Sequence, residues 1–306
     1  MILLVLEQTL NGLQYGVMLL LMAAGLTLVF GIMNLVNLAH GSLYMVGAYL
    51  ATGFYQWTGS FLASVALALA ATLVVGIVVE VVALRTLYER DHLDQVLATF
   101  GLILFFNELI AIVWGRAALY SSLPGWLSGH MQVLPGVRYP VYRALVILVG
   151  LVVAALLYLM VTRTRLGMLI RAGASNRTMV AALGVYIRLL YTVVFGVGAA
   201  LAGLAGLIAG PIYAVQPGMG EQILIQVFVV IVIGGIGSIR GAVVGAVIVG
   251  MVDTLGRAFL KPVLSIVLSP SAADTAGPAL ASMLIYMLMA AVLAVRPQGL
   301  FPVRGR

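Results

Sequence analysis

The chain has 306 residues, of which 63% are hydrophobic and only 8% are charged. A water-soluble domain is roughly a quarter charged, so this composition excludes a soluble protein and indicates a membrane protein. The arginines behind the net charge of +7 lie in short connections beside apolar segments, which indicates membrane topology rather than a nucleic-acid partner.

Long apolar runs, such as residues 64–79 and 144–161, show no alternation of polar and apolar residues. This pattern favours an all-α, polytopic bundle of transmembrane helices over a β-barrel. We expect eight or nine spans in a single domain covering residues 1–306. They lie near residues 9–30, 36–56, 61–84, 95–114, 140–161, 189–210, 221–236, 241–260 and 279–295.

The count is open because residues 31–50 form either a full crossing or a broken, partly re-entrant segment. Three polar residues, Asn34, Asn37 and His40, lie in its first half. If the segment is helical, Asn34 and Asn37 share one face with Gly41 and Met45. Polar side chains at this depth need partners, so they either bond to a neighbouring helix or face a solute pathway.

The remaining polar residues within the spans differ in whether a local partner is near. Glu80 lies five residues before Arg85 and Asp253 four before Arg257, which predicts local charge pairs. Glu108, beside Asn107, has no partner three or four residues away. Asn107 and Glu108 are therefore candidates for either helix packing or function.

Five arginines and no acidic residue lie between Arg163 and Arg188. The positive-inside rule places this segment in the cytoplasm, together with the C-terminal tail and residues 85–94. By parity, the loop from Gly115 to Arg138 faces outward. We expect residues 172–183 to form a short helix at the membrane surface, bounded by glycines at 167 and 184.

Glycines and alanines spaced four residues apart mark helix contacts in lipid. Residues 196–210 form one such run, and Gly237, Gly241 and Gly245 form another. Because Ser238 and Arg240 interrupt the apolar pattern there, we expect a tight turn at residues 237–241. Gly234, Gly235, Gly237, Ser238 and Gly241 are candidates for a packing or gating turn.

Catalytic chemistry is sparse in this sequence. There is no cysteine, the three histidines are isolated, and neither a metal-ligand cluster nor a nucleophile with a base is visible. The single lysine, Lys261, does not lie in a nucleotide-binding loop. We expect no enzyme activity and no cofactor or metal bound by this chain.

The sequence resembles the permeases of branched-chain amino acid ABC importers, specifically the LivH-type subunit, almost from end to end. The matching segments are Asn11-Gly12 with residues 31–49, then residues 167–184, 233–245 and 296–301. One departure is Arg240, where a proline is common in the family.

The resemblance implies an inner-membrane permease of a bacterial cell that works with several partners. These are a second permease, either LivM-like or a second copy, two cytoplasmic ATPases that bind ATP and Mg, and a periplasmic substrate-binding protein. In such a permease we expect Asn34, Asn37, His40, Asn107 and Glu108 along the substrate pathway. The resemblance assigns ATPase coupling, within residues 163–188, to Gly167, Arg171, Ala172, Asn176, Ala181, Leu183 and Gly184.

Branched-chain amino acids are the cargo that this resemblance implies, although relatives also carry urea, amides or aromatic compounds. A different class of protein, an ion-coupled secondary transporter, would need no ATPase. In such a transporter Glu108 or Asp253 would be the coupling group.

Overall fold

The computed structural model describes residues 2–134 and 136–302. Within them the chain forms a bundle of α-helices with one short β-hairpin. The long helices are α1 (Ile2–Met33), α2 (His40–Thr58), α3 (Phe61–Val82), α4 (His92–Trp114), α5 (Val141–Arg163), α8 (Ile187–Ala209), α9 (Met219–Gly234), α10 (Ile239–Leu264) and α11 (Pro270–Val295). The short elements are η1 (Leu84–Leu87), η2 (Gly125–Leu127), β1 (His130–Leu134), β2 (Val137–Pro140), α6 (Arg165–Ser175) and α7 (Arg177–Ala182).

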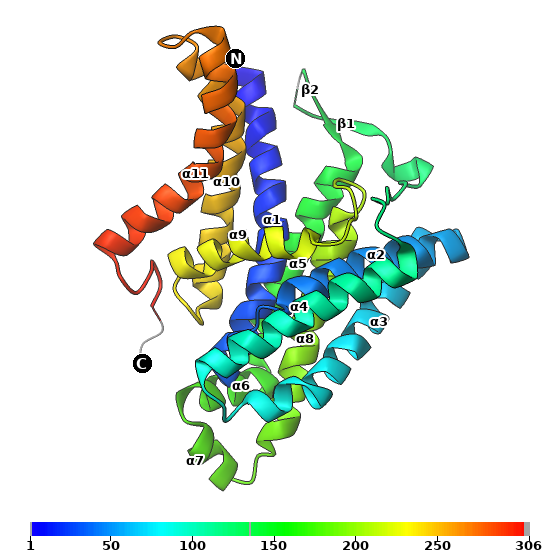
Figure 1. The fold of residues 1–306 in the computed structure, drawn as a ribbon, viewed down its shortest axis with the longest axis vertical. Coiled ribbons are helices and arrows are strands. Elements are labelled where there is room, and N and C mark those ends of the chain that lie inside the picture. Colours follow the sequence, from blue (N-terminus) through cyan, green and yellow to red (C-terminus); the bar gives the residue numbers. More distant parts are fainter. Residues whose placement is uncertain (1, 135, 303–306) are drawn as a thin grey trace.

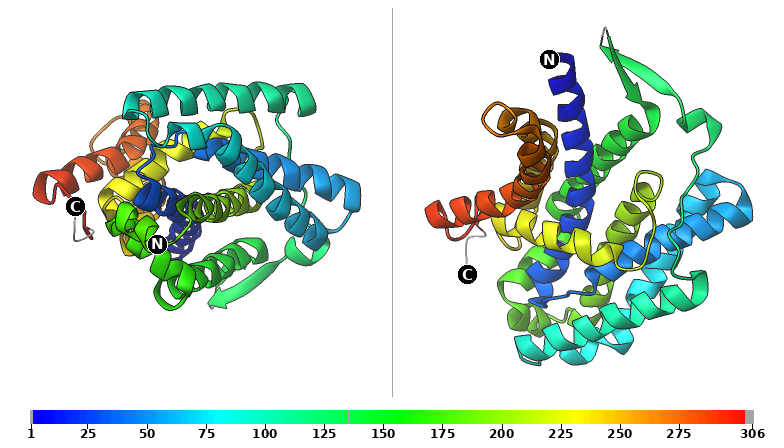
Figure 2. Two further views of the ribbon diagram at one scale, coloured as in Figure 1. Left: turned by 90° about the horizontal axis from the view of Figure 1, so that it is seen from below. Right: turned by 45° about the horizontal axis from the view of Figure 1, so that its top comes forward.

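The bundle has two chemically distinct ends (Figure 1). The start of α1 and the antiparallel β1–β2 hairpin lie at one end, which we call the hairpin end. Helices α6 and α7 lie at the opposite end, which we call the arginine end. The end of α11 lies away from the start of α1, and the further views show the helices leaning over one another at varied angles (Figure 2).

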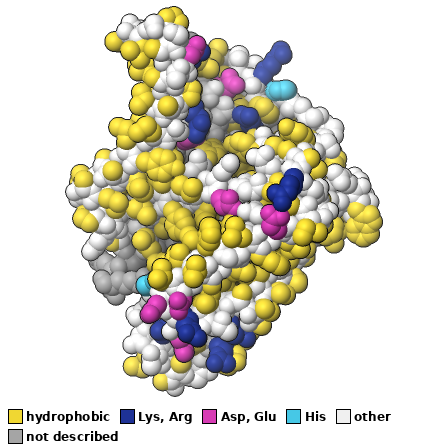
Figure 3. Space-filling view, viewed as in Figure 1, with side chains coloured by type: hydrophobic (Ala, Val, Ile, Leu, Met, Phe, Trp, Pro, Cys, Tyr) yellow, Lys and Arg dark blue, Asp and Glu magenta, His cyan; other side chains and the backbone are white. Residues whose placement is uncertain are grey.

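The nine long helices coincide with the nine predicted spans, so the prediction of an all-α polytopic bundle is confirmed. Seven of the described helices are long and apolar enough to cross a membrane by themselves, whereas α2 is not among them and α9 is shorter. The predicted boundaries were wrong chiefly at α1 and α11, which begin seven and nine residues earlier than expected. Hydrophobic side chains cover much of the visible face, and charged side chains gather in a few places on it (Figure 3).

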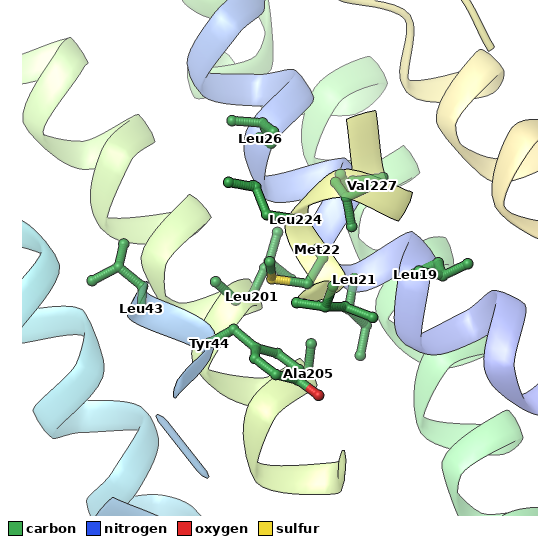
Figure 4. Packing of buried hydrophobic residues seen from close by; sticks show 14 of the residues in the cluster. Leu19, Leu21, Met22, Leu26, Leu43, Tyr44, Leu201, Ala205, Leu224 and Val227 are labelled. Atoms are coloured by element: carbon green, nitrogen blue, oxygen red, sulfur yellow. The ribbon is translucent and has the colours of Figure 1, made fainter. Parts of the chain in front are cut away.

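Helix α1 lies at the centre of the bundle, packed against α5, α8, α9 and α10. Its inner stretch of leucines and methionines is buried, whereas helices at the periphery expose theirs. Figure 4 shows this core: Leu19, Leu21, Met22 and Leu26 of α1 lie among Leu43 and Tyr44 of α2, Leu201 and Ala205 of α8, and Leu224 and Val227 of α9. Since lipid tails are as apolar as leucine, close packing rather than hydrophobicity holds such a core together.

Glycines bring the helix backbones into direct contact, as their spacing predicted. A Cβ atom on Gly41 of α2 would lie 2.3 Å from the carbonyl oxygen of Gly220 in α9. One on Gly47 would lie 2.4 Å from the Cα of Gly203 in α8. Larger residues at these positions would therefore force the helices apart.

The segment after α1 is broken rather than helical. Residues 34–39 lie outside any helix, and Asn34 has a positive φ of 52°, which ends α1. The broken alternative is therefore the correct one. The expectation that Asn34 and Asn37 share a helix face with Gly41 and Met45 is wrong, because the chain changes direction between the asparagines and α2.

The C-terminal segment closes over the turn between α9 and α10. The backbone amides of Leu300 and Phe301 donate to the carbonyl oxygens of Ile233 and Gly234, at 2.9 and 3.0 Å. These bonds satisfy carbonyl groups that a helix end otherwise leaves unpaired. The tail thus ties the end of α11 to the end of α9.

Candidate functional site

A cavity of about 780 Å³ opens near the hairpin end between α1, α5, α9 and α10. Because α1 and α5 begin at this end and α10 approaches it, the polar residues near those helix termini converge on one space. This hairpin-end cavity is lined by Gln8, Asn11, Gln14, Tyr15, Tyr44, Arg143, Ile212, Tyr213, Ala214, Gln216, Met219, Gln222, Ile223, Gln226, Asp253, Thr254, Arg257 and Ala258.

Charges of both signs lie in this cavity. Asp253 accepts two hydrogen bonds from Arg257, at 2.9 and 3.0 Å, and its side chain is only 8% exposed. Arg143 donates to the carboxamide oxygen of Asn11 at 2.6 Å. Arg257 is thus neutralised by a carboxylate, whereas Arg143 has a neutral partner. Arg143 therefore remains available to an anionic group of a solute.

Neutral polar groups complete the cavity. Tyr15 of α1 donates a hydrogen bond to Gln226 of α9 and so links the two helices in the cavity wall. Burial raises the pKa of Tyr213, in the connection before α9, so its hydroxyl stays protonated and can donate. Gln216 and Gln222 add carboxamides that both donate and accept.

Apolar side chains form part of the same wall. Ile212, Met219 and Ile223 line the cavity beside the charged residues. A small molecule that carries both charges and an aliphatic side chain finds a partner here for each of its parts. With about 780 Å³, the cavity is larger than such a molecule.

The three polar residues predicted in the segment 31–50 lie elsewhere. Asn34 is exposed, whereas Asn37 and His40 are buried. The carboxamide of Asn37 has no hydrogen-bond partner among the described residues. The ring of His40 lies against Gly25 of α1. None of the three lines the hairpin-end cavity, and a role in the substrate pathway stays a prediction.

Asn107 and Glu108 have different environments. Asn107 accepts from the backbone amide of Gly218 at 3.1 Å and donates to the Glu221 carboxylate, which fixes the start of α9. Glu108 pairs with Arg116 at 2.8 Å, and its side chain is 62% exposed. The sequence suggested no partner for Glu108 because Arg116 is eight residues away, beyond the end of α4.

Both predicted local charge pairs are present. Asp253 pairs with Arg257, and the buried Glu80 pairs with Arg85 at 3.2 Å. Glu80 also accepts from Thr192 of α8 at 2.7 Å. Through this second contact Glu80 links α3 to α8. Arg85 and Thr192 together compensate the cost of burying the Glu80 carboxylate.

The segment predicted to couple to an ATPase forms two helices instead of one. The side chain of Asn176 accepts from the backbone amide of Met179 at 2.9 Å and begins α7, so the expected single helix over residues 172–183 is wrong. Gly184, with a φ of 85°, follows α7 as predicted. Gly167, however, lies inside α6 against the end of α5 and does not bound the segment.

The other residues named for coupling divide between these two helices. Arg171 and Ala172 belong to α6, Ala181 belongs to α7, and Leu183 follows it. Leu183 is 76% exposed, and Met179 nearby is 59% exposed. Exposed apolar side chains at the arginine end form a surface on which another protein chain could pack.

The predicted glycine turn is present, displaced by about two residues. It runs over residues 235–238, with positive φ at Gly235 and Gly237, and Ser238 caps α10 by accepting from Gly241. Gly234 and Gly241 flank it in direct backbone contact. A role in gating stays a prediction.

The hairpin-end cavity itself was missed by sequence reasoning, although a signal was present. Gln8, Asn11 and Tyr15 recur at helical spacing on one face of α1, and Gln222 and Gln226 do so on α9. Among the described residues, no group of three histidine, aspartate or glutamate side chains could hold a metal ion.

Comparison with known proteins gives a consistent result. A family model described as "Branched-chain amino acid transport system / permease component" matches residues 8–293. The chain is 30% identical to the high-affinity branched-chain amino acid transport system permease protein BraD of Pseudomonas aeruginosa, covering 96% of this chain and 95% of that protein. It is 29% identical to the corresponding protein LivH of Escherichia coli (strain K12), covering 84% and 87%. No solved structure matches at a significant level.

Proposed function

The chain belongs to the family of branched-chain amino acid transport system permease components, and we propose that it is the membrane subunit through which an ATP-driven importer moves branched-chain amino acids. The observation that carries this proposal is the family match over residues 8–293, which leaves only the chain ends unmatched. The hairpin-end cavity supports the substrate class, because it combines charges of both signs with aliphatic walls.

The positions of the arginines support one orientation of the chain in the membrane. With α6 and α7 in the cytoplasm, the hairpin end and its cavity face the outside of a bacterial inner membrane. A periplasmic substrate-binding protein would then deliver the amino acid to this cavity. The whole chain, residues 1–306, would act as one permease domain, with coupling over residues 163–188.

Partner subunits would supply the energy. Two cytoplasmic ATPases, holding ATP and Mg, would dock on the exposed side chains of α7 and the residues after it, such as Met179 and Leu183. A second permease, either LivM-like or a second copy, would complete the pore. In this division of labour the chain itself performs no catalysis and holds no cofactor.

The carboxylates also favour this proposal over ion coupling. An ion-coupled transporter needs a carboxylate free to bind and release its ion. Glu108 and Asp253, the two candidates, are each paired with an arginine, Arg116 and Arg257.

A reconstitution experiment tests the proposal. The chain is assembled in liposomes with the second permease, the ATPases and the binding protein, and ATP hydrolysis is measured with the binding protein loaded with leucine, urea or an aromatic acid. We expect leucine to give the strongest stimulation. Uptake driven by an ion gradient without any ATPase subunit would contradict the proposal.

A further inference from the structure

A second cavity, of about 410 Å³, lies near the arginine end between α1, α5, α6 and the α9–α10 turn. This arginine-end cavity is separate from the hairpin-end cavity and shares no lining residue with it. Unlike the hairpin-end cavity, it has a mostly apolar wall and is lined by no described carboxylate. Its chemistry therefore differs from that of the proposed substrate passage.

Two arginines from different elements meet at this cavity. Arg171 reaches it from α6, and Arg240 reaches it from the first turn of α10. Neither side chain makes an ion pair or a hydrogen bond within residues 2–134 and 136–302. Two unpaired positive charges beside one space favour an occupant with a negative charge.

Hydroxyl groups lie next to these charges. Ser175 and Ser238 line the cavity, and Thr27 lines it from α1. The Thr27 hydroxyl is buried, with a residue exposure of 1%, and has no hydrogen-bond partner among the described residues. A buried hydroxyl without a partner is costly, so this atom is an independent indication that the cavity receives a polar group.

The rest of the wall is aliphatic and continues onto the outside of the bundle. Leu28, Val161 and Ile239 line the cavity. Tyr158 of α5 and Ile236 of the turn also line it, and they are 51% and 48% exposed. An occupant can thus extend from the arginines along an exposed apolar surface of the bundle.

We propose that the arginine-end cavity binds an anionic phospholipid of the cytoplasmic leaflet. Its phosphate group pairs with Arg171 and Arg240, and one acyl chain follows the aliphatic wall toward Tyr158. Basic pockets between membrane helices on the cytoplasmic side bind such headgroups. The apolar wall extends to the exposed side chains of Tyr158 and Ile236. This favours a lipid over a small soluble anion, which has no acyl chain to contact that wall.

The bound lipid holds two elements together. One arginine belongs to α6, in the segment predicted to meet the ATPase, and the other begins α10, whose far half carries Asp253 and Arg257 of the hairpin-end cavity. A phosphate between them therefore fixes α6 against α10. The inference does not depend on which solute is transported, only on the arginine end facing the cytoplasmic leaflet.

The test compares lipid retention by variants of the full chain. Wild-type protein and the double variant R171Q/R240Q are equilibrated in nanodiscs of equal parts phosphatidylglycerol and phosphatidylcholine, extracted, and examined for retained lipid by native mass spectrometry. Because each arginine contributes about 1 kcal/mol toward an anionic lipid, the double variant should lose about tenfold or more of its preference for phosphatidylglycerol. The double variant R177Q/R188Q removes the same charge at the same end outside the cavity, and it should retain the preference.

A third variant separates the cavity from its charge. Ala174→Phe places a ring in the cavity from an exposed position of α6 and leaves both arginines intact, and it should also displace the lipid. Equal retention by wild type and R171Q/R240Q, or an equal loss in R177Q/R188Q, would overturn the proposal. So would saturable leucine binding at this cavity, blocked by R171Q/R240Q, with no preference for phosphatidylglycerol, because the site would then accept a small solute.

Discussion

At the residue scale, the hairpin-end cavity depends on how each charge is paired. Asp253 is nearly buried and satisfied by both nitrogens of the Arg257 fork, whereas Arg143 has only the neutral Asn11. A carboxylate solute therefore competes with an amide at Arg143, but at Arg257 it would have to displace a charge. This difference makes Arg143 the position at which a carboxylate is expected to bind.

Replacing Arg143 with glutamine should weaken transport selectively. The loss of one charge-assisted contact is expected to raise the apparent KM for leucine about tenfold, equivalent to about 1.4 kcal/mol, with a smaller effect on maximal rate. Uptake into proteoliposomes measures both parameters. Arg138→Gln, an exposed arginine of the nearby hairpin, is the control, and an equal rise in KM there would show that the effect is general charge loss.

The Asp253–Arg257 pair should act mainly on stability. Asp253→Asn leaves Arg257 without its charged partner. Because Asp253 is buried and Arg257 is exposed, losing the pair should lower the free energy of unfolding by about 1–2 kcal/mol, between the values for exposed and buried pairs. Removing both charges in D253N/R257Q should restore most of the stability that D253N loses. Thermal unfolding in detergent measures both variants. A double variant no more stable than the single one would contradict this interpretation.

At the element scale, glycine contacts set the distances between α2, α8 and α9. The start of α2 and the start of α9 are in direct backbone contact at Gly41 and Gly220. Since α9 forms one wall of the hairpin-end cavity, this contact positions Gln222 and Gln226 within it. Packing and site geometry are therefore linked through a single helix.

Gly220→Ala should destabilise the chain by about 1–3 kcal/mol, because the added methyl group meets the Gly41 carbonyl oxygen at 2.2 Å and must push α9 away. Gly101→Ala is the matched control. Gly101 lies within α4, where nothing lies within 4 Å of an added Cβ, and alanine favours a helix by up to about 1 kcal/mol. Thermal unfolding of the two variants should move in opposite directions, and equal destabilisation would argue against the contact.

The short helices at the arginine end should carry the contact with the ATPase. Leu183→Asp places a charge on an exposed apolar position and should abolish co-purification with an ATPase subunit, while the protein remains inserted in the membrane. Leu93→Asp, which makes the same change at an exposed apolar position of α4 outside residues 163–188, should not. Unchanged co-purification of the Leu183 variant would refute the assignment of α7 and its flanks to coupling.

At the scale of the whole molecule, the sequence predicted what depends on local pattern. Apolar runs gave all nine long helices, and small-residue spacing gave the contacts of α8 and the turn before α10. Two errors have local causes. Asn34 adopts a positive φ that no periodicity reveals, and Asn176 starts a new helix inside a segment that looked continuous.

The hairpin-end cavity could not be predicted in the same way. Its residues come from α1, α2, α5, α9, α10 and the connection before α9, and each segment contributes only a few polar positions. The spacing of Asp253 and Arg257 predicts their pair. It does not predict that Arg143, more than a hundred residues away in the sequence, lines the same cavity. Only the packing of helices around α1 brings these groups together.

The most direct test of the central claim, a permease with its cavity outside and its coupling helices inside, is the sidedness of single cysteines. The chain has no cysteine, so Gln222→Cys in the cavity and Arg177→Cys in α7 can each be labelled without background. With a membrane-impermeant maleimide, the Gln222 variant should react in right-side-out vesicles and the Arg177 variant only in inside-out vesicles. The reverse pattern would place α6 and α7 outside, beyond the reach of any cytoplasmic ATPase, and would contradict the account.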